Sequence, residues 1–589
     1  MAGVGGGARM DYLLHIFIMI AIYAILGLSF NLILGYTGLI AMCHAAFFAI
    51  GAYTSALLGI HFGTHFLIGI AAGMIVSGVI SLLVAIPAIR VRDEYLIVTT
   101  LALLMIVYTV LMNWIDLTRG AAGLSGIPRP SFFGYKVSSP LAFIPLLFGF
   151  TIVVFLACWR IVHSPFGRVL RAIREDEVAT ESLGKNVRAF KVWIFVTGGA
   201  LAAIAGSLFA HYMTYISPAN FTINDTILIF AVVIIGGAAN SWGPVVGAII
   251  LVSVMEALRF MEISPLIVGF TRQIAYGVVL ILFMCFRPQG FMGEFAALPK
   301  RDEKKPSAPK GNGDRMVPQG TSVKGGGLFQ QEVRPQESGA LLRLDGVSKN
   351  FGGLKAVNHC TLDLKNGEIV GLIGPNGAGK TTLFNVITGF YPTETGAVHF
   401  SGQDISRLSP HRITHLGIAR SFQDVRLFHN MTVLDNVLVA RPKQTGESLL
   451  WAFLRFGRVS REERENREKA LAYLEFVGLA GQAGELAGNL SFAEQKLLSL
   501  ARLLATEARL ILLDEPASGL DPKVMENLFP LIKDLVKFGK TICIVEHNME
   551  VIRAMVDEIV FLNEGKVLAR GTPEQIMKAP ELAEIYFGG

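Results

Sequence analysis

Charged residues are scarce in this sequence. Asp, Glu, Lys and Arg make up 17% of its 589 residues, against roughly 25% in ordinary soluble domains. The shortage is concentrated in residues 11–286, because the chain after Lys300 has the ionic content of a soluble domain. The net charge of +6 is small for this length and gives no reason to expect a nucleic-acid partner. We therefore expect a chain that is divided between lipid and water.

Cysteine is also scarce. The five cysteines include no CxxC pair, and three of them fall in apolar segments, so the sequence indicates neither a disulfide framework nor a zinc site. The start of the chain has no evident cleavage site, because residues 1–9 are glycine-rich and run directly into an apolar stretch. We expect an uncleaved first membrane span rather than a signal peptide.

Long apolar runs are abundant. Hydrophobic residues make up 52% of the chain, and about 20 in succession are enough for one helical crossing of a bilayer. The candidate spans are residues 12–35, 38–60, 66–89, 95–115, 141–162, 190–212, 226–258 and 265–286. This pattern predicts a polytopic α-helical membrane domain in a lipid bilayer.

Basic residues concentrate in three loops, at Arg90 and Arg92, across residues 160–191 and at Arg287. Such residues mark the cytoplasmic loops of membrane proteins. We therefore expect these loops, and the soluble part of the chain that follows Arg287, to lie in the cytoplasm.

The apolar run 226–258 is interrupted by the glycine-rich stretch 236–244. We expect it to enter the membrane and turn back there as a broken hairpin. Two interpretations of the break remain open: free backbone N–H groups that bind a substrate carboxylate, or close helix packing by small residues. Packing is the more common reason, so Asn240 and Ser241 are minor candidates for a substrate site.

A phosphate-binding loop is present in the soluble half. Residues 374–381 read GPNGAGKT, directly after the apolar run 369–373 and before a helical pattern. Glycines let backbone N–H groups close around phosphates, the lysine reaches the β and γ phosphates, and the threonine hydroxyl binds Mg²⁺. The nucleotide-binding candidates are Gly374, Asn376, Gly377, Gly379, Lys380, Thr381 and Thr382.

Two carboxylates follow a second apolar strand pattern at residues 510–513. This is the arrangement of a Walker B motif. We expect Asp514 to bind Mg²⁺ through water and Glu515 to orient or deprotonate the attacking water. Together the two motifs predict an α/β P-loop NTPase that hydrolyses ATP with Mg²⁺.

Further motifs in the expected order make residues 341–589 resemble the ATP-binding cassette (ABC) ATPases. They are the Q-loop around Gln423, the signature at 490–495, the D-loop at 518–521 and the switch residue His547. The fold expected from this resemblance is a membrane domain followed by an ABC ATPase domain.

The resemblance also implies roles for these residues. Gln423 and His547 are expected to act in catalysis beside Glu515. Gln423 is further expected at the Mg²⁺ site, together with Thr381 and Asp514.

At the two ends of the nucleotide, the resemblance implies that Phe351 stacks on adenine and that Ser491 contacts the γ-phosphate held by an opposite subunit. The signature departs from the usual Leu-Ser-Gly-Gly-Gln, because Phe492, Ala493 and Glu494 fill its last three places. Ala493 limits backbone approach, and Glu494 adds a negative charge near a phosphate. This departure predicts an asymmetric pair of ATPases.

Finer features resemble one importer family, the transporters of branched-chain amino acids. The segments that carry this resemblance are 427–436, 446–470 and 571–589 in the ATPase half and 31–40, 47–54 and 236–247 in the membrane half. It implies a permease and an ATPase fused in one chain. The expected domains are 1–293 and 341–589, joined by a flexible Lys-, Pro- and Gly-rich linker at 294–340.

The same resemblance implies partners and a location. We expect a second permease and a second ATPase, or a homodimer, with an extracytoplasmic solute-binding protein in a bacterial or archaeal inner membrane. The stretch 172–184 scans as a short amphipathic helix stopped by glycine. It is similar to the coupling helix by which importer permeases contact their ATPases.

The cargo is left open by the sequence. Branched-chain amino acids are the default of the family, with urea, short amides and aromatic acids as alternatives. The spans contain no charged cluster that would name a charged solute. An exporter is disfavoured because only residues 164–191 form a long charged loop. A membrane-anchored ATPase that moves no solute is the alternative of another class.

Overall fold

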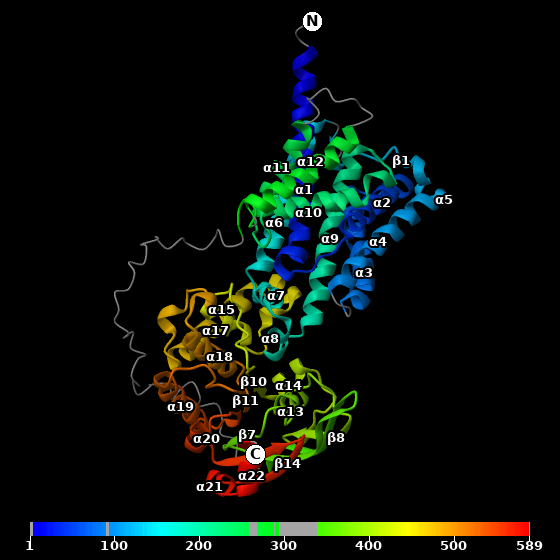
Figure 1. The fold of residues 1–589 in the computed structure, drawn as a ribbon. Coiled ribbons are helices and arrows are strands. Elements are labelled where there is room, and N and C mark those ends of the chain that lie inside the picture. Colours follow the sequence, from blue (N-terminus) through cyan, green and yellow to red (C-terminus); the bar gives the residue numbers. More distant parts are fainter. Residues whose placement is uncertain are drawn as a thin grey trace. The chain divides into compact units, whose positions relative to one another are not determined.

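The computed structural model describes residues 4–89, 93–132, 135–137, 139–257, 268–287, 289–293 and 339–587. The chain forms two compact units (Figure 1). The membrane unit comprises Met1–Arg174 and Arg188–Ala308, and the ATPase unit comprises Glu175–Val187 and Pro309–Gly589. The predicted linker lies outside the described residues except for its last two, as do Arg90 and Arg92, and the predicted domain limits stay a prediction.

The membrane unit is built from long apolar helices. Within the described residues, seven helices are long and apolar enough to cross a membrane. With the shorter helices included, the unit contains α1 (Val4–Thr37), α2 (His44–Phe62), α3 (Phe66–Ala88), α4 (Asp93–Asn113), α5 (Ile115–Thr118), α6 (Pro140–Val162), α7 (Pro165–Glu175), α9 (Val187–Met213), α10 (Ile223–Gly236), α11 (Gly243–Ala257) and α12 (Val268–Phe286). Short antiparallel pairs join β1 (Leu124–Ser125) to β4 (Tyr215–Ile216) and β2 (Ser131–Phe132) to β3 (Tyr135–Lys136).

Small residues allow close helix packing in this unit. A Cβ atom on Gly51 of α2 would lie 2.3 Å from the carbonyl oxygen of Ala203 in α9, and one on Gly206 would lie 2.0 Å from that of Phe48. Without a hydrophobic driving force between helices in lipid, such backbone approach supplies the van der Waals contact that holds them together. A larger side chain at either glycine would separate α2 from α9.

The predicted broken hairpin is confirmed, because α10 ends at Gly236 and α11 begins at Gly243. A Cβ atom on Gly236 would lie 1.9 Å from the carbonyl oxygen of Gly243, so the two helices pack backbone to backbone. The Asn31 side chain accepts a hydrogen bond from Ala239 N–H at 3.0 Å and donates one to the Asn240 carbonyl at 2.9 Å. These contacts favour the packing interpretation of the break over substrate binding.

The ATPase unit contains two sheets. The mainly parallel sheet has the order β10-β11-β12-β7-β13-β14 and the antiparallel sheet has the order β6-β5-β8-β9. The strands are β5 (Ala340–Phe351), β6 (Leu354–Lys365), β7 (Ile369–Ile373), β8 (Thr395–Phe400), β9 (Gln403–Asp404), β10 (Ile418–Arg420), β11 (Leu510–Asp514), β12 (Thr541–Val545), β13 (Glu558–Asn563) and β14 (Lys566–Gly571). Strands β7, β11 and β12 are buried along their whole length, as their continuous apolar runs require.

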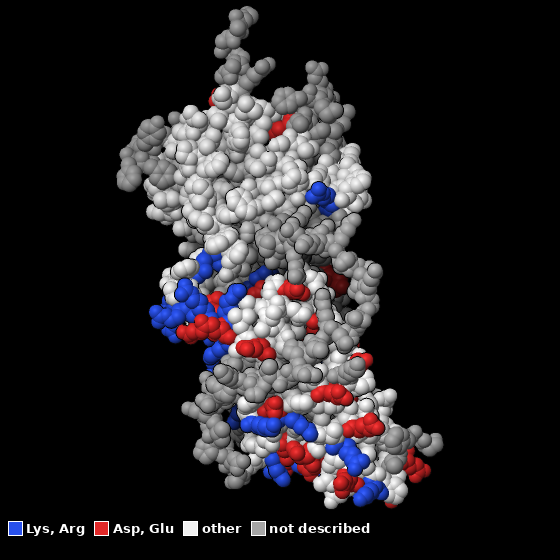
Figure 2. Space-filling view, turned by 90° about the vertical axis from the view of Figure 1, so that its left-hand side faces the viewer, with Lys and Arg blue, Asp and Glu red and all other residues white. Residues whose placement is uncertain are grey.

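Helices complete the ATPase unit. They are α8 (Glu177–Ser182), α13 (Lys380–Ile387), α14 (Pro410–Leu416), α15 (Val433–Ala440), α16 (Leu449–Leu454), α17 (Phe456–Phe476), α18 (Phe492–Ala505), α19 (Pro522–Lys537), α20 (Met549–Met555), α21 (Pro573–Met577) and α22 (Pro580–Phe587). Figure 2 shows Lys, Arg, Asp and Glu scattered over the described surface of this unit, whereas few are coloured on the visible face of the membrane unit. The predicted fold class, a helical membrane domain followed by an α/β P-loop ATPase, is confirmed.

Candidate functional site

The phosphate-binding loop joins β7 to α13, as the motif requires. Gly377 has φ +82°, and nothing lies within 4 Å of where its Cβ would stand, whereas a Cβ on Gly379 would lie 2.1 Å from the Ala356 carbonyl oxygen. The loop therefore presents an open backbone cradle on one side and packs tightly on the other, which fits bound phosphates. Asn376 and Thr381 are exposed, and Thr382 is half-buried, at the mouth of this cradle.

Lys380 begins α13 and folds back over the loop. Its Nζ atom donates hydrogen bonds to the carbonyl oxygens of Gly374 at 2.7 Å and Pro375 at 3.0 Å. Burial lowers the pKa of this ammonium, and the nearby carboxylates of Glu515 and Asp514 offset part of that shift. A cation with two exchangeable carbonyl partners can turn to a phosphate without breaking a salt bridge.

Asp514 ends β11 in a buried ion pair with Arg420 at the end of β10. The Nη2 and Oδ2 atoms are 3.0 Å apart, and the two side chains are 2% and 1% exposed. Burial raises the pKa of Asp514, and Arg420 opposes that rise. Its other oxygen, Oδ1, is buried and has no hydrogen-bond partner among the described residues. A free carboxylate oxygen at this point fits a water-mediated Mg²⁺ contact.

The three predicted catalytic side chains converge. Glu515 accepts a hydrogen bond from Nε2 of Gln423 at 3.1 Å, and its other oxygen lies 3.0 Å from Nε2 of His547. Glu515 has φ +48°, a conformation that costs energy in a residue with a Cβ and that is concentrated at functional sites. The backbone bend carries its side chain out of the buried strand toward residues that follow β10 and β12.

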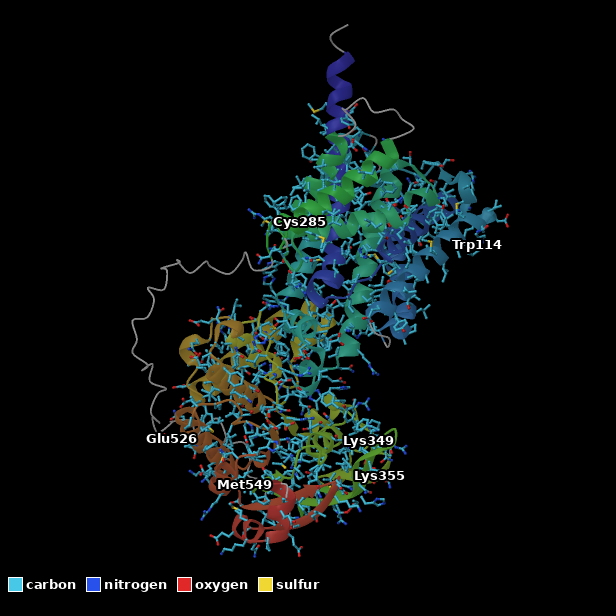
Figure 3. All side chains as sticks on the ribbon, in the orientation of Figure 1. Trp114, Cys285, Lys349, Lys355, Glu526 and Met549 are labelled. Atoms are coloured by element: carbon cyan, nitrogen blue, oxygen red, sulfur yellow. The ribbon has the colours of Figure 1, made fainter. Side chains whose placement is uncertain are left out.

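The predicted adenine platform lies in the antiparallel sheet. Phe351 is 43% exposed and meets the ring of Tyr391 edge-on, with 5.2 Å between ring centroids. The ammonium of Lys349 is 5.4 Å from the centroid of the Phe351 ring. Figure 3 labels Lys349 and Lys355, which come from the paired strands β5 and β6. An exposed ring of this kind can stack on a base.

The signature serine is capped within its own helix. Ser491 donates to Oε2 of Glu494 from its backbone N–H and from its hydroxyl, each at 2.8 Å. Gln482 holds the other oxygen of Glu494 at 2.6 Å. The donors that the family resemblance assigns to a phosphate therefore serve an internal carboxylate here. The S-x-x-E spacing of a capping box was a usable sequence signal for this contact.

The loop Glu175–Val187 packs on the rest of the ATPase unit. Lys185 is buried, and its Nζ donates to the Arg441 carbonyl at 2.7 Å and to Glu447 at 2.5 Å. Asp176 pairs with Arg426 at 3.1 Å. Because Arg426 lies three residues after Gln423, the loop contacts the segment that also reaches Glu515, the predicted catalytic carboxylate.

The prediction of one helix over 172–184 was wrong in one respect. The structure has two helices, because α7 ends at Glu175 and α8 begins at Glu177. Asp176 adopts an extended conformation between them and caps α8 by accepting from Ala179 N–H at 2.9 Å. An Asp within an amphipathic pattern is a helix-start signal that the periodicity alone does not reveal.

Three further residues at the site were missed from the sequence. Arg420 pairs with Asp514, Lys496 donates to the Glu515 carbonyl at 3.2 Å, and Glu546 accepts from Ala517 N–H at 2.7 Å. Only the position of Arg420, at the end of an apolar strand pattern, could have marked it in advance.

Comparisons with known proteins match both halves of the chain. Residues 12–286 match the family described as "Branched-chain amino acid transport system / permease component", and residues 357–518 match "ABC transporter". The ATPase half is similar to the high-affinity branched-chain amino acid transport ATP-binding protein BraF of Pseudomonas aeruginosa. Identity is 40% over 249 residues, which are 42% of this chain and 98% of that protein.

The membrane half is similar to the high-affinity branched-chain amino acid transport system permease protein LivM of Salmonella typhimurium. Identity is 33% over 298 residues, which are 46% of this chain and 68% of that protein. Among solved structures, the ADP conformation of MJ1267, an ATP-binding cassette of an ABC transporter, is 34% identical, with a TM-score of 0.38. That match covers 42% of this chain and 99% of MJ1267.

Proposed function

Because this chain belongs to the ABC transporter family of branched-chain amino acid permeases and ATPases, we propose that it is an importer subunit. Its permease and ATPase share one polypeptide and take up branched-chain or related amino acids at the expense of ATP. The observation that carries the proposal is the convergence of Gln423, Glu515 and His547 in a unit that also includes the loop Glu175–Val187, which lies in the sequence between helices α7 and α9.

The chain's own residues would perform the hydrolysis. Backbone N–H groups around Gly377 and the ammonium of Lys380 bind the phosphates. Glu515 orients the attacking water and accepts its proton, while Gln423 and His547 hold that carboxylate in place. Thr381, Gln423 and Asp514 would hold a Mg²⁺ ion, which when bound would supply positive charge against the phosphates.

Coupling is proposed to run through the loop Glu175–Val187, the docked loop, which packs on the rest of the ATPase unit. Gln423 senses the nucleotide, and Arg426 and Asp176 pass its displacement to α8. The chain on either side of α8 continues into α7 and α9, so movement of the loop would switch the permease between its outward and inward openings. This proposal is supported by the buried anchor at Lys185.

Partners and location follow from the family. We infer a second permease, a second ATPase and an extracytoplasmic solute-binding protein, with the complex in a bacterial or archaeal inner membrane and the ATPase unit in the cytoplasm. A homodimer of this chain is the alternative. The basic residues of 160–191 and Arg287 support this orientation.

Uptake into vesicles tests the proposal. Vesicles that contain this chain and its genomic neighbours are offered radiolabelled leucine and urea in parallel, with Glu515→Gln as the matched inactive control. Leucine accumulation that disappears in the variant is expected. Accumulation of urea without leucine would show that the cargo is urea rather than a branched-chain amino acid. If neither solute accumulates, short amides and aromatic acids are offered next. A lack of accumulation of all of them, with ATP hydrolysis intact, would favour an anchored ATPase that moves no solute.

A further inference from the structure

The segment Leu449–Arg461 combines exposed apolar side chains with arginines. Its large apolar residues Leu450, Trp451, Phe453, Leu454 and Phe456 are between 36% and 66% exposed. The segment holds three arginines and no acidic residue. Other exposed apolar residues of this unit are more dispersed, as is normal for soluble surfaces. This composition is that of an interfacial membrane element rather than of a solvated helix.

Three apolar side chains of α16 share one face, and an arginine lies beside the aromatic residue of the same helix. On α16, Leu450, Phe453 and Leu454 are spaced i, i+3 and i+4, so they share one side of the helix. The guanidinium of Arg455 lies 4.1 Å from the Trp451 ring centroid, which keeps an arginine beside the aromatic anchor. Trp and Arg together are typical of the boundary between acyl chains and headgroups.

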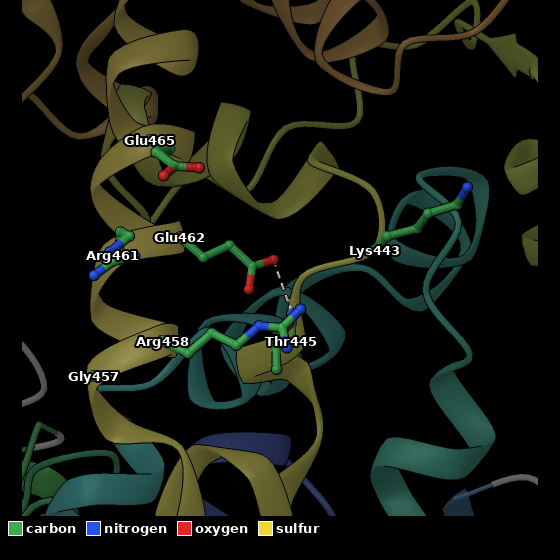
Figure 4. A pocket seen from close by; sticks show the side chains of 7 residues that line it. All are labelled: Lys443, Thr445, Gly457, Arg458, Arg461, Glu462 and Glu465. Atoms are coloured by element: carbon green, nitrogen blue, oxygen red, sulfur yellow. Dashed lines mark hydrogen bonds between the residues drawn. The ribbon is translucent and has the colours of Figure 1, made fainter.

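A hollow of about 560 Å³ adjoins the arginines at the start of α17 (Figure 4). It is lined by Lys443, Arg458 and Arg461 and by the carboxylates of Glu462 and Glu465. Glu462 is already engaged by Thr445 N–H at 3.0 Å. Cations therefore exceed carboxylates in a space of headgroup size, with Arg458 directed across it in the figure.

Chain connectivity holds this segment near the bilayer. Lys185 is buried against Glu447, two residues before α16 begins. Two residues after Lys185, Val187 starts α9, an apolar helix of 27 residues. Such a helix is about 40 Å long and exceeds a hydrocarbon core of about 30 Å by only about 10 Å. The anchor of α16 thus stays within reach of the lipid headgroups.

We propose that Leu449–Arg461 is a docking surface for anionic phospholipids of the cytoplasmic leaflet, with the α16 side chains among the headgroups and Arg458 and Arg461 on a lipid phosphate. Charge complementarity and the tether through Lys185 select this occupant. The surface is independent of which solute the permease carries. It would hold the ATPase unit at the membrane.

A spin label near lipid headgroups tests this surface. The complete complex is placed in nanodiscs of phosphatidylglycerol and phosphatidylcholine that include a nickel-chelating lipid. Cys285, an exposed cysteine on α12 (Figure 3), is first removed as Cys285→Ser, since the other four cysteines are buried. Labels are then attached at Leu454→Cys and, as the matched control, at Leu354→Cys, which is 70% exposed in the same unit.

Nickel at the headgroups is expected to accelerate relaxation of the label at 454 and not at 354. Equal relaxation at the two positions would overturn the proposal, and so would a label at 454 that is shielded from both water and lipid, since a protein partner would then cover it. Neither outcome depends on transport, so failure here leaves the proposed function to its own test.

A charge variant tests the arginines separately. Each basic residue near an anionic membrane contributes roughly fivefold to binding, so Arg458→Gln with Arg461→Gln should weaken headgroup affinity roughly 25-fold. The relaxation at 454 in phosphatidylglycerol discs should fall toward its value in phosphatidylcholine alone. Lys533→Gln with Lys578→Gln is the control for net charge. An unchanged signal in the arginine variant would refute their role.

Discussion

Glu515 stands where three separate segments meet. Its carboxylate contacts Gln423 and His547, and its backbone is in the left-handed region. This residue therefore combines an energetically costly backbone conformation with two polar partners. That combination is expected of a functional group whose orientation must be fixed. Neither partner is near it in the sequence.

Glu515→Gln should lower ATP hydrolysis by about 100-fold to 10,000-fold, the usual contribution of a positioned general base. The amide keeps the size and the hydrogen bond to Gln423 but cannot accept the proton. Nucleotide binding should persist, as measured by equilibrium binding of a fluorescent ATP analogue, whereas Lys380→Ala should weaken it. Undiminished hydrolysis would remove Glu515 from the catalytic role.

Glu494 is the second residue whose role can be isolated. Because it occupies both donors of Ser491, a phosphate from an opposite subunit would have to displace a carboxylate of the same charge. Glu494→Gln with Ala493→Gly should therefore raise ATP turnover of the assembled complex. Glu475→Gln, an exposed change on α17, is the control. Unchanged turnover would mean that this signature contacts no phosphate.

At the scale of elements, the loop Glu175–Val187 is held by local capping and by long-range contacts. Gly184 at φ +84° forms the turn that follows α8, and a Cβ there would lie 3.3 Å from Thr414 and 3.5 Å from His415. Thr414 also donates to the Ser182 carbonyl at 3.0 Å. The turn thus fits closely against α14, while Lys185 fixes the other side.

Lys185→Met should uncouple transport from hydrolysis. The change leaves Glu447 with Gln444 as a partner at 2.9 Å, and loss of one member of a buried ion pair costs about 3 kcal/mol. The solute transported per ATP should fall, while ATP turnover continues. Arg188→Met, an exposed basic position three residues away, is the control. A normal transport ratio would exclude Lys185 from coupling.

Docking of this loop should depend on pH through His415. Burial chiefly, with the charges of Lys185, His411 and Lys443, lowers its pKa in the docked state. The docked form therefore binds the proton less readily, so docking is favoured above the ordinary pKa of about 6.5 and weakens as pH falls below it. Solute per ATP should drop in acid, and His415→Asn should abolish that part of the drop. If the transport ratio falls equally in the wild-type protein and the variant, the pH dependence does not come from His415.

The molecule joins one unit whose composition suits lipid to a second unit whose composition suits water. The membrane unit packs through glycines and internal polar pairs such as Asn31 with the broken hairpin. The ATPase unit has a continuous apolar core and an exposed charged surface. One chain supplies one permease and one ATPase domain. Because its signature departs from the usual sequence, we predict that it pairs with a different ATPase rather than with a second copy of itself.

Two copies of this chain that carry different affinity tags should therefore not co-purify when expressed with their genomic neighbours. Native mass spectrometry of the complex should show one fused chain with a second permease and a second ATPase. Recovery of both tags in one complex would establish the homodimer, and the capped signature would then be present at both nucleotide sites.

The sequence by itself determined the features that reside in local patterns. Apolar length specified the first six candidate spans, since a helix must satisfy its own backbone in lipid, but it did not make 226–258 one helix or give 265–286 the length of a span among the described residues. The glycine spacing of residues 374–381 specified the phosphate loop. The break within 226–258 was also predictable, because small residues interrupt a span there. Motif order was enough to predict the family.

Tertiary structure alone decided which side chains meet. The pairing of Arg420 with Asp514, the convergence on Glu515 and the burial of Lys185 join residues tens to hundreds of positions apart. Such contacts depend on strand order and on how a loop packs, which no local periodicity encodes. The sequence therefore named the chemical groups of the site, while their geometry and the anchor of the docked loop came from folding.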